Sequence, residues 1–278
     1  MARLLLMEGN TAEMRRKADK LGVRSSSQVY IDAIRPHFPD IGIDVVNAAD
    51  EGEGLPAGAG LEDYDGLVIA GSGLHAYDQG FAVTNQIELV KAYGATGGPI
   101  LGSCWGLQIA VIAAGGEVGL SPNGREVGVA RKVLLNEDGR AHPFFRNKPA
   151  AFDAPAIHYD EITGLPGAAR LLASNAHSEV QAAIVPVDRS EVWAVQYHPE
   201  FDMAQLAMLI RLYADPMVEQ GFFADDAARE AHLSLIDRLV EDPADKAAAW
   251  RLGVDADMLD DRVRRAEIIN WIEARVLT

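Results

Sequence analysis

The chain has little cysteine and no long hydrophobic run. Cys104 is the single cysteine among 278 residues, which excludes an intramolecular disulfide and a metal site built from several thiolates. No stretch approaches the roughly 18 apolar residues of a membrane span, and the apolar run within residues 1–7 is too short for the core of a signal peptide. We therefore expect a cytoplasmic protein with no membrane partner, no metal and no other cofactor.

Basic side chains are also scarce. The chain has 25 Lys and Arg against 41 Asp and Glu, a formal net charge of −16 at pH 7. A surface this acidic repels phosphate backbones, so we expect no nucleic-acid partner. Hydrophobic residues make up 49% of the chain, which is typical of a folded globular protein and excludes global disorder.

Short apolar runs alternate with helix-like segments through the first 125 residues. The pattern predicts buried parallel strands at residues 4–7, 43–46, 67–70 and 100–101, each followed by a turn or helical segment. This alternation predicts a doubly wound α/β sheet covered by helices on both faces. The later segments are shorter and β-like, and they predict an added antiparallel layer.

The last part of the chain has a helical pattern. An amphipathic helix is predicted where apolar residues recur every three or four positions, at Leu259, Val263, Ala266, Ile269, Ile272 and Val276. We therefore divide the chain into a domain over residues 1–205 and a helical C-terminal extension over residues 206–278. The apolar face of this extension packs on its own domain or on a second copy as a homo-oligomer.

Cys104 lies between an apolar strand and a predicted helix. A nucleophile on such a sharp turn is held in a strained backbone conformation, and Gly102 and Gly106 supply the flanking positions where a side chain would clash. The N-terminus of the following helix favours a thiolate. The backbone N–H of Trp105 is placed to stabilise an oxyanion.

Two further segments complete a candidate site. A strand-like run from Val192 delivers His198 and Glu200, two residues apart on one face of an extended chain, so that Glu200 orients His198 as the base for Cys104. The turn Gly71-Ser72-Gly73 ends another apolar strand and offers backbone N–H groups to the same oxyanion hole.

Together these segments resemble the class I (triad-type) glutamine amidotransferases. The resemblance rests on residues 102–108 and 196–200, with the turn at 71–73 before them and the segment 157–161 between them, in family order. It covers roughly residues 3–205. It implies a flavodoxin-like sheet and hydrolysis of the glutamine side-chain amide to glutamate and ammonia. Cys104 would form a γ-glutamyl thioester, with His198 as acid and base.

The resemblance also assigns residues around the nucleophile. Gln108 looks like a residue that contacts glutamine, and His158 and Asp160 are expected to frame the substrate pocket. The turn departs from the usual Gly-Gly-Pro, which leaves the oxyanion donor within Gly71-Ser72-Gly73 undefined. His75, in the following loop, is either a residue of the substrate pocket or simply exposed, and we favour the second.

Three functions remain open. The first is release of ammonia to a separate ammonia-accepting synthase, because the sequence has neither a phosphate-binding loop nor a Ser-Gly-Gly-x-Asp stretch; residues 206–278 would then dock that partner. The second is a free-standing γ-glutamyl amide or peptide hydrolase. The third is a non-catalytic regulatory subunit, whose mark would be a broken triad.

Overall fold

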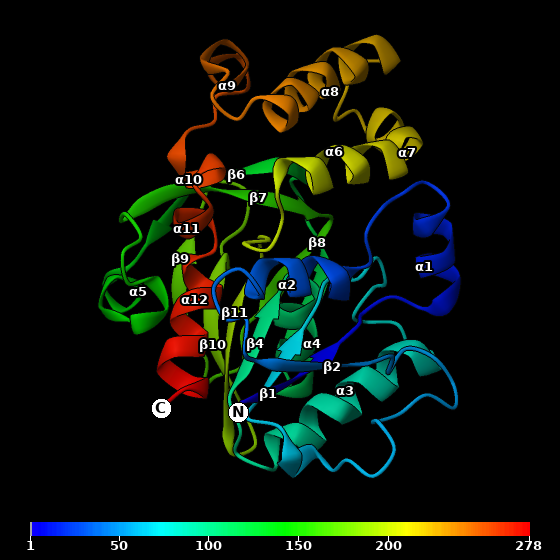
Figure 1. Cartoon of the computed structure of the whole chain (residues 1–278), viewed down its shortest axis with the longest axis vertical. Coiled ribbons are helices and arrows are strands. Elements are labelled where there is room, and N and C mark those ends of the chain that lie inside the picture. Colours follow the sequence, from blue (N-terminus) through cyan, green and yellow to red (C-terminus); the bar gives the residue numbers. More distant parts are fainter. Residues whose placement is uncertain (1) are drawn as a thin grey trace.

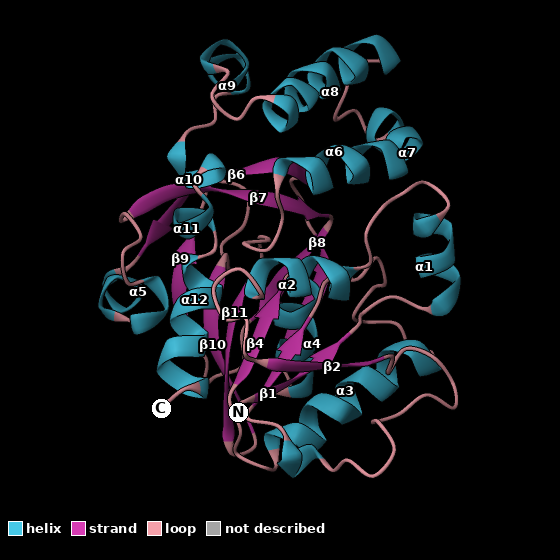
Figure 2. Ribbon diagram, in the orientation of Figure 1, coloured by secondary structure: helices cyan, strands magenta, loops and turns pink. Residues whose placement is uncertain are grey.

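One large sheet forms the centre of the protein. The computed structural model describes residues 2–278, and within that range nine strands pair in the order β2-β1-β3-β4-β11-β10-β9-β6-β7 (Figure 2). β5 and β8 form a separate pair. The strands are β1 (Arg3–Met7), β2 (Gly42–Val46), β3 (Gly66–Ile69), β4 (Ile100–Ser103), β5 (Glu117–Leu120), β6 (Glu126–Leu135), β7 (Ala151–His158), β8 (Asp160–Gly164), β9 (Arg170–Ser174), β10 (Ala182–Val187) and β11 (Ser190–Val195).

Five neighbouring strands are parallel. β1 pairs with β2 and β3, β3 pairs with β4, and β4 pairs with β11, all in the same direction. The order 2-1-3-4 followed by a fifth parallel strand is that of a flavodoxin-like doubly wound sheet, so the predicted fold class is confirmed. Ligands bind such sheets outside the carboxyl ends of the strands, where the strand order reverses.

The antiparallel strands predicted beyond residue 125 are present. β10, β9, β6 and β7 continue the same sheet with antiparallel pairing. Most of the antiparallel part therefore extends the central sheet sideways, and β5 with β8 is the pair that stands apart. The edge of the parallel portion at β11 is thereby covered by β10 and the strands beyond it.

Helices cover both faces of the sheet and one end of it. Leu4 and Leu6 of β1 belong to a core shared with α2 and α12, whereas Leu5 and Met7 face a second core shared with α3 and α4. The helices are α1 (Ala12–Asp19), α2 (Ser26–Ile34), α3 (Phe81–Gly94), α4 (Trp105–Ala113), α5 (Glu137–Ala141), α6 (Met203–Leu212), α7 (Ala214–Glu219), α8 (Asp226–Glu241), α9 (Lys246–Leu252), α10 (Ala256–Leu259), α11 (Asp261–Arg264) and α12 (Ala266–Trp271), with 3₁₀ turns at Leu61–Asp63 and Pro143–Phe145 and a π-helical turn at Ile272–Val276.

The helices after residue 202 occupy two places. α6, α7, α8 and α9 stack over β6 and β7 at the top of Figure 1, where Leu206, Ile210 and Leu233 build a third core. The predicted amphipathic helix is present as α11, α12 and the π-helical turn, interrupted at Arg265. Its apolar side chains Trp271 and Ile272 are fully buried in the core under the sheet. That apolar face therefore packs within the chain.

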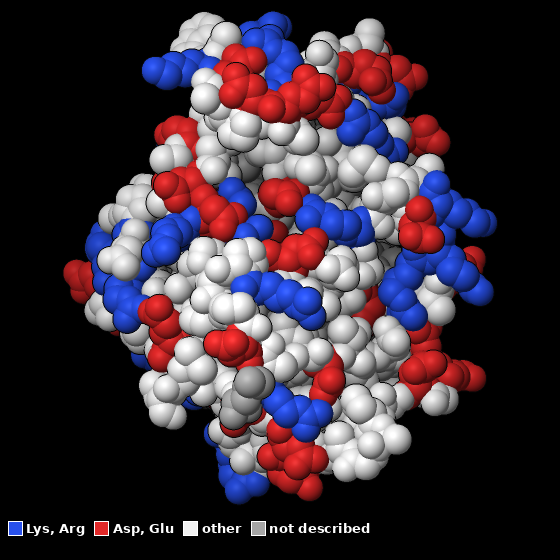
Figure 3. Space-filling model, viewed as in Figure 1, with Lys and Arg blue, Asp and Glu red and all other residues white. Residues whose placement is uncertain are grey.

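The surface carries charges of both signs. On the face shown in Figure 3, acidic and basic side chains are interspersed, so the net charge of −16 forms no single-sign patch there. Among residues 2–278, no helix combines the length and the apolar character needed to cross a bilayer.

A buried ion pair ties α12 to the sheet. Lys148 Nζ lies 3.1 Å from Glu267 Oε1, and both side chains are almost completely inaccessible. The hydroxyl of Tyr197, which follows β11, donates to the same Glu267 oxygen at 2.5 Å. Burial raises the pKa of Glu267, and Lys148 and Tyr197 act against that rise.

Removing one member of this pair leaves an uncompensated buried charge. We expect Glu267→Leu to lower the free energy of unfolding by about 3–5 kcal/mol, because Lys148 then lacks a partner. Urea denaturation followed by circular dichroism measures the loss. The matched control is Glu88→Leu, whose pair with Lys91 is exposed and contributes at most ~1 kcal/mol. Equal losses in the two variants would contradict the role given to Glu267.

Candidate active site

Cys104 occupies a strained position between β4 and α4. Its backbone has φ 49° and ψ −96°, a conformation that a residue with a Cβ rarely adopts. The Cys104 N–H donates to the carbonyl of Val195 on β11 at 2.8 Å, which fixes the turn against the neighbouring strand. The thiol therefore stands at the carboxyl edge of the sheet, as the sequence predicts.

The two flanking glycines permit this turn. A Cβ on Gly102 would lie 2.7 Å from the carbonyl carbon of Gly106, and a Cβ on Gly106 would lie 2.9 Å from the carbonyl oxygen of Ile69. Both distances are shorter than real Cβ contacts. Any other residue at either position would push α4 away from the strands and displace the thiol.

His198 and Glu200 form a buried pair beside the cysteine. His198 Nδ1 lies 2.7 Å from Glu200 Oε1, and the imidazole stacks on Phe201 with 3.9 Å between ring centroids. The expectation that residues 198–200 stay extended is wrong, because the Phe201 N–H donates to the His198 carbonyl and closes a turn. That turn brings Glu200 to the imidazole and leaves Nε2 for Cys104.

The charge on Glu200 raises the pKa of His198. Burial alone lowers the pKa of His198, but the charges of Glu200 and Cys104 and hydrogen bonds to both side chains outweigh it. The pKa of His198 is raised to about 10. The imidazole therefore keeps a proton at neutral pH while it faces the sulfur.

A buried chain of hydrogen bonds fixes the position of the Glu200 carboxylate. Tyr30 of α2 donates to Ser103 Oγ at 2.8 Å, and Ser103 Oγ donates to Glu200 Oε1 at 2.9 Å. Burial raises the pKa of Tyr30 well above its usual value, and the charge of Glu200 raises it further, so the phenol stays protonated and donates. Sequence reasoning missed Tyr30, because a tyrosine on an apolar helix face is typical of a core residue.

The turn after β3 lies against the histidine. A Cβ on Gly71 would lie 3.0 Å from His198 Cε1, so a side chain at this position would crowd the imidazole. The Gly73 N–H donates to Asn10 Oδ1 at 3.0 Å, which removes Gly73 from the predicted oxyanion donors. The amides of Gly71 and Ser72 are left for that role, opposite the Trp105 N–H in the first turn of α4.

The other predicted residues line or frame the same cavity. Gln108 is buried and its side chain donates to the carbonyl of Asp160 at 3.3 Å. His158 is held on both sides, with Nδ1 3.0 Å from the Asp160 carbonyl and Nε2 2.8 Å from Glu126 Oε2. Because both ring nitrogens already bond to protein acceptors, His158 shapes the wall and has no nitrogen left for a substrate.

His75 is not simply an exposed residue, contrary to expectation. Its Nδ1 lies 2.6 Å from Asp160 Oδ2, and its ring stacks on Tyr77 with 5.2 Å between centroids. The side chain is 44% exposed but lines the cavity. It thus connects the loop after β3 with the start of β8, and it holds the buried carboxylate of Asp160 at the cavity wall.

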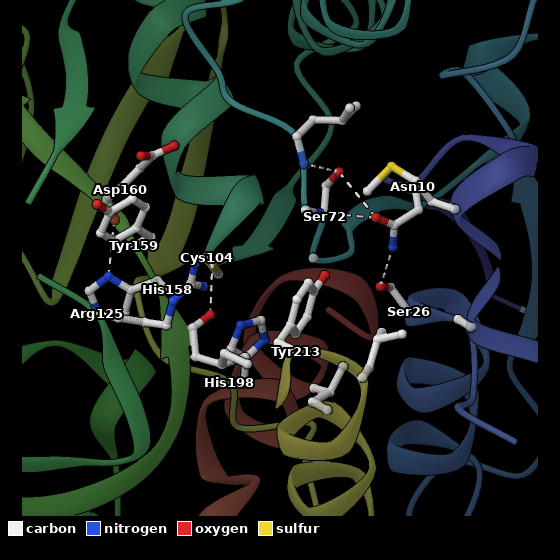
Figure 4. A pocket seen from close by; sticks show the side chains of 18 of the residues that line it. Asn10, Ser26, Ser72, Cys104, Arg125, His158, Tyr159, Asp160, His198 and Tyr213 are labelled. Atoms are coloured by element: carbon white, nitrogen blue, oxygen red, sulfur yellow. Dashed lines mark hydrogen bonds between the residues drawn. The ribbon is translucent and has the colours of Figure 1, made fainter. Parts of the chain in front are cut away.

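A cavity of about 520 Å³ contains these groups (Figure 4). Cys104, His198, Gln108 and the turn after β3 all line it. So do three residues that sequence reasoning missed, Met14 of α1, Arg125 before β6 and Tyr213 after α6. No short motif marks them, since each reaches the cavity through long-range packing. Within residues 2–278, no three His, Cys, Asp or Glu side chains gather in a way that would hold a metal ion.

Comparison with known proteins agrees with this geometry. Residues 37–211 match the family described as glutamine amidotransferase class-I. The chain is 32% identical over 282 residues to a γ-glutamyl-L-1-hydroxyisopropylamide hydrolase from Pseudomonas sp., covering 99% of this chain and 93% of that one. It is 25% identical to γ-glutamyl peptidase 3 from Arabidopsis thaliana, over 65% of this chain and 72% of the relative.

Solved structures share the fold. A glutamine amidotransferase from Thermotoga maritima superposes with a TM-score of 0.68 and 19% identity, covering all of this chain and 99% of that one. The fold, the cysteine at the turn between β4 and α4, and the family match over more than half of the residues lead to one conclusion. The chain belongs to the class I glutamine amidotransferase family and is an enzyme of that cysteine-dependent class.

Proposed function

We propose that the protein hydrolyses γ-glutamyl amides through a γ-glutamyl thioester on Cys104. The observation that carries the proposal is the strained Cys104 at the same cavity as a buried histidine that a carboxylate orients. This is the arrangement of nucleophile, base and orienting group that nucleophilic catalysis requires. The γ-glutamyl hydrolase and peptidase relatives support the same choice of substrate.

Each group has one task in the reaction. The sulfur of Cys104 attacks the carbonyl carbon of the amide, and the oxyanion accepts hydrogen bonds from the Trp105 N–H and from the Gly71–Ser72 turn. His198 gives its proton to the leaving nitrogen, the C–N bond breaks, and the thioester remains. His198 then takes a proton from water, which attacks the thioester and releases glutamate and the thiolate.

The charged side of the cavity suits the amino-acid end of the substrate. Arg125 stacks over Tyr159 at 4.8 Å, and its Nε donates to Gln220 at 2.9 Å, which leaves its terminal nitrogens for a carboxylate. The buried Asp160 is the matching acceptor for an ammonium group. Gln108 donates to the Asp160 backbone and fixes this wall.

The identity of the leaving group, ammonia or a substituted amine, is a separate question. The γ-glutamyl-L-1-hydroxyisopropylamide hydrolase and γ-glutamyl peptidase relatives favour a substituted amine as leaving group over ammonia passed to a separate synthase. Transfer to such a synthase, a homo-oligomer and a cytoplasmic location stay predictions. The regulatory-subunit alternative is tested by the variant that follows.

Loss of the sulfur should abolish turnover. We expect Cys104→Ser to reduce kcat/KM for γ-glutamyl amides by at least ~10³-fold, because the serine hydroxyl is a far weaker nucleophile beside this histidine. Amine release measured by chromatography gives the rate. Mass spectrometry should find an electrophilic glutamine analogue attached to Cys104 in the unchanged protein and absent from the variant. A variant that retains full turnover would refute the mechanism and favour a non-catalytic role for Cys104.

The pH profile reports on Glu200. The His198 proton is needed by the leaving group, so the rate should fall as the pH rises through about 10. Glu200→Gln removes the charge that raises the pKa of His198, so the alkaline fall should move to lower pH, with kcat reduced by ~10²-fold. The control is Glu88→Gln on the exposed side of α3, which should leave both unchanged. An alkaline limb that does not move would show that Glu200 does not act on His198.

A further inference from the structure

The two sides of the oxyanion hole come from different parts of the chain. One side is the Gly71–Ser72 turn, and the other is the N–H of Trp105 at the start of α4. The ladder between β3 and β4 ends at Ile69 and Gly102, before either group is reached. An oxyanion needs donors at about 2.7–3.1 Å from a single position, so contacts beyond the ladder must hold the two sides in register.

Gln86 of α3 is a buried polar residue that does not line the cavity. Its Oε1 accepts a hydrogen bond from the Trp105 indole N–H at 2.8 Å. Its Nε2 donates to the carbonyl of Gly9 at 3.1 Å and to that of Ala82 at 2.7 Å. Because an indole N–H can only donate, the Gln86 amide has one orientation, with its oxygen toward Trp105 and its nitrogen toward Gly9.

The carbonyl of Gly9 extends this connection to the turn after β3. It also accepts a hydrogen bond from the Ser72 hydroxyl at 2.8 Å. A Cβ on Gly9 would lie 2.7 Å from the Gly71 carbonyl oxygen, so the segment after β1 is in direct contact with the turn. Gln86 and Gly9 therefore connect the indole of Trp105 to the turn through three consecutive hydrogen bonds.

Asn10 anchors the same segment without Gln86. Its Oδ1 accepts a hydrogen bond from the Gly73 N–H at 3.0 Å, and its Nδ2 donates to Ser26 at 3.1 Å (Figure 4). Its Nδ2 also lies 3.2 Å from Oε1 of Glu8, a completely buried carboxylate whose other oxygen accepts from the first turn of α2. Loss of Gln86 alone should therefore shift the turn relative to α4 and leave the segment folded.

We propose that Gln86 is a positioning residue of the oxyanion hole, which holds the N–H of Trp105 and the Gly71–Ser72 amides at the separation that the oxyanion requires. Gln86 acts through these two groups and does not touch the substrate. The inference rests on the proposed function, because the oxyanion forms when Cys104 attacks an amide carbonyl. Since the oxyanion develops only in the transition state, loss of Gln86 should lower kcat and leave KM nearly unchanged.

Gln86→Met tests this position, because methionine keeps the approximate volume and removes the bonds to Trp105 and Gly9. The substrate is L-glutamine or γ-L-glutamylethylamide, whichever the unchanged protein hydrolyses faster. We expect kcat to fall by about 10- to 100-fold, with KM within about 2-fold of its unchanged value. The matched control is Asn85→Leu on α3, which removes a bond of the same kind to the Ala48 carbonyl and should leave kcat and KM unchanged.

Alkylation of Cys104 by iodoacetamide separates positioning from a structural defect. The sulfur displaces iodide from a saturated carbon and no oxyanion forms, so the rate reports on the thiolate and on access to it. Mass spectrometry should find the same alkylation rate in Gln86→Met and in the unchanged protein. A parallel loss of alkylation and turnover would indicate a damaged site and would overturn the proposal, as would an unchanged kcat.

Trp105→Phe removes the same bond from its other end. It should lower kcat to a similar extent, and the double variant should lose little more than either single variant, because both changes break the contact between the indole and Gln86. Losses that multiply would overturn the shared path. If Gln86→Met does not fold, kcat and alkylation of Trp105→Phe decide by the same criteria. No turnover of either substrate by the unchanged protein would overturn the proposed function together with this inference, whereas turnover that both variants retain in full would overturn the inference alone.

Discussion

The catalytic geometry depends on the backbone of one residue, Cys104, held at positive φ between β4 and α4. Such a conformation costs about 1–3 kcal/mol and persists only where the surroundings determine it. Here the surroundings are the Val195 carbonyl on one side and the close approach of Gly102 and Gly106 on the other. Three parallel strands therefore fix the sulfur before any substrate arrives.

Buried contacts also fix His198 and Glu200, the two residues that act with the sulfur. Glu200 receives hydrogen bonds from His198 and Ser103. Ser103 in turn receives one from Tyr30 of α2, a helix that covers the face of the sheet opposite to α4. The imidazole is further confined by the ring of Phe201. These side chains have few accessible rotamers before the substrate binds, so little conformational entropy is lost during the reaction. A rigid scaffold lowers the entropic part of a barrier in this way.

Short-range patterns account for what the sequence predicts. Cys104, His198 and Glu200 stand in compact motifs, and the alternation of apolar runs predicts the parallel sheet. Arg125 and Tyr213 carry no such mark, because their place at the cavity arises from packing between elements far apart in the chain. The same reason explains why the sequence leaves the oxyanion donor within Gly71-Ser72-Gly73 undefined, since the amide of Gly73 bonds to Asn10 from the end of another strand.

The contact between Tyr197 and Glu267 joins residues 70 positions apart, immediately before the imidazole. During synthesis, the ribosome must therefore release the chain at least as far as α12 before the segment that carries His198 has its final support. A nascent chain from which Cys104 has already emerged still lacks the contact between Tyr197 and Glu267. Assembly of the site is thus expected to wait for the arrival of α12.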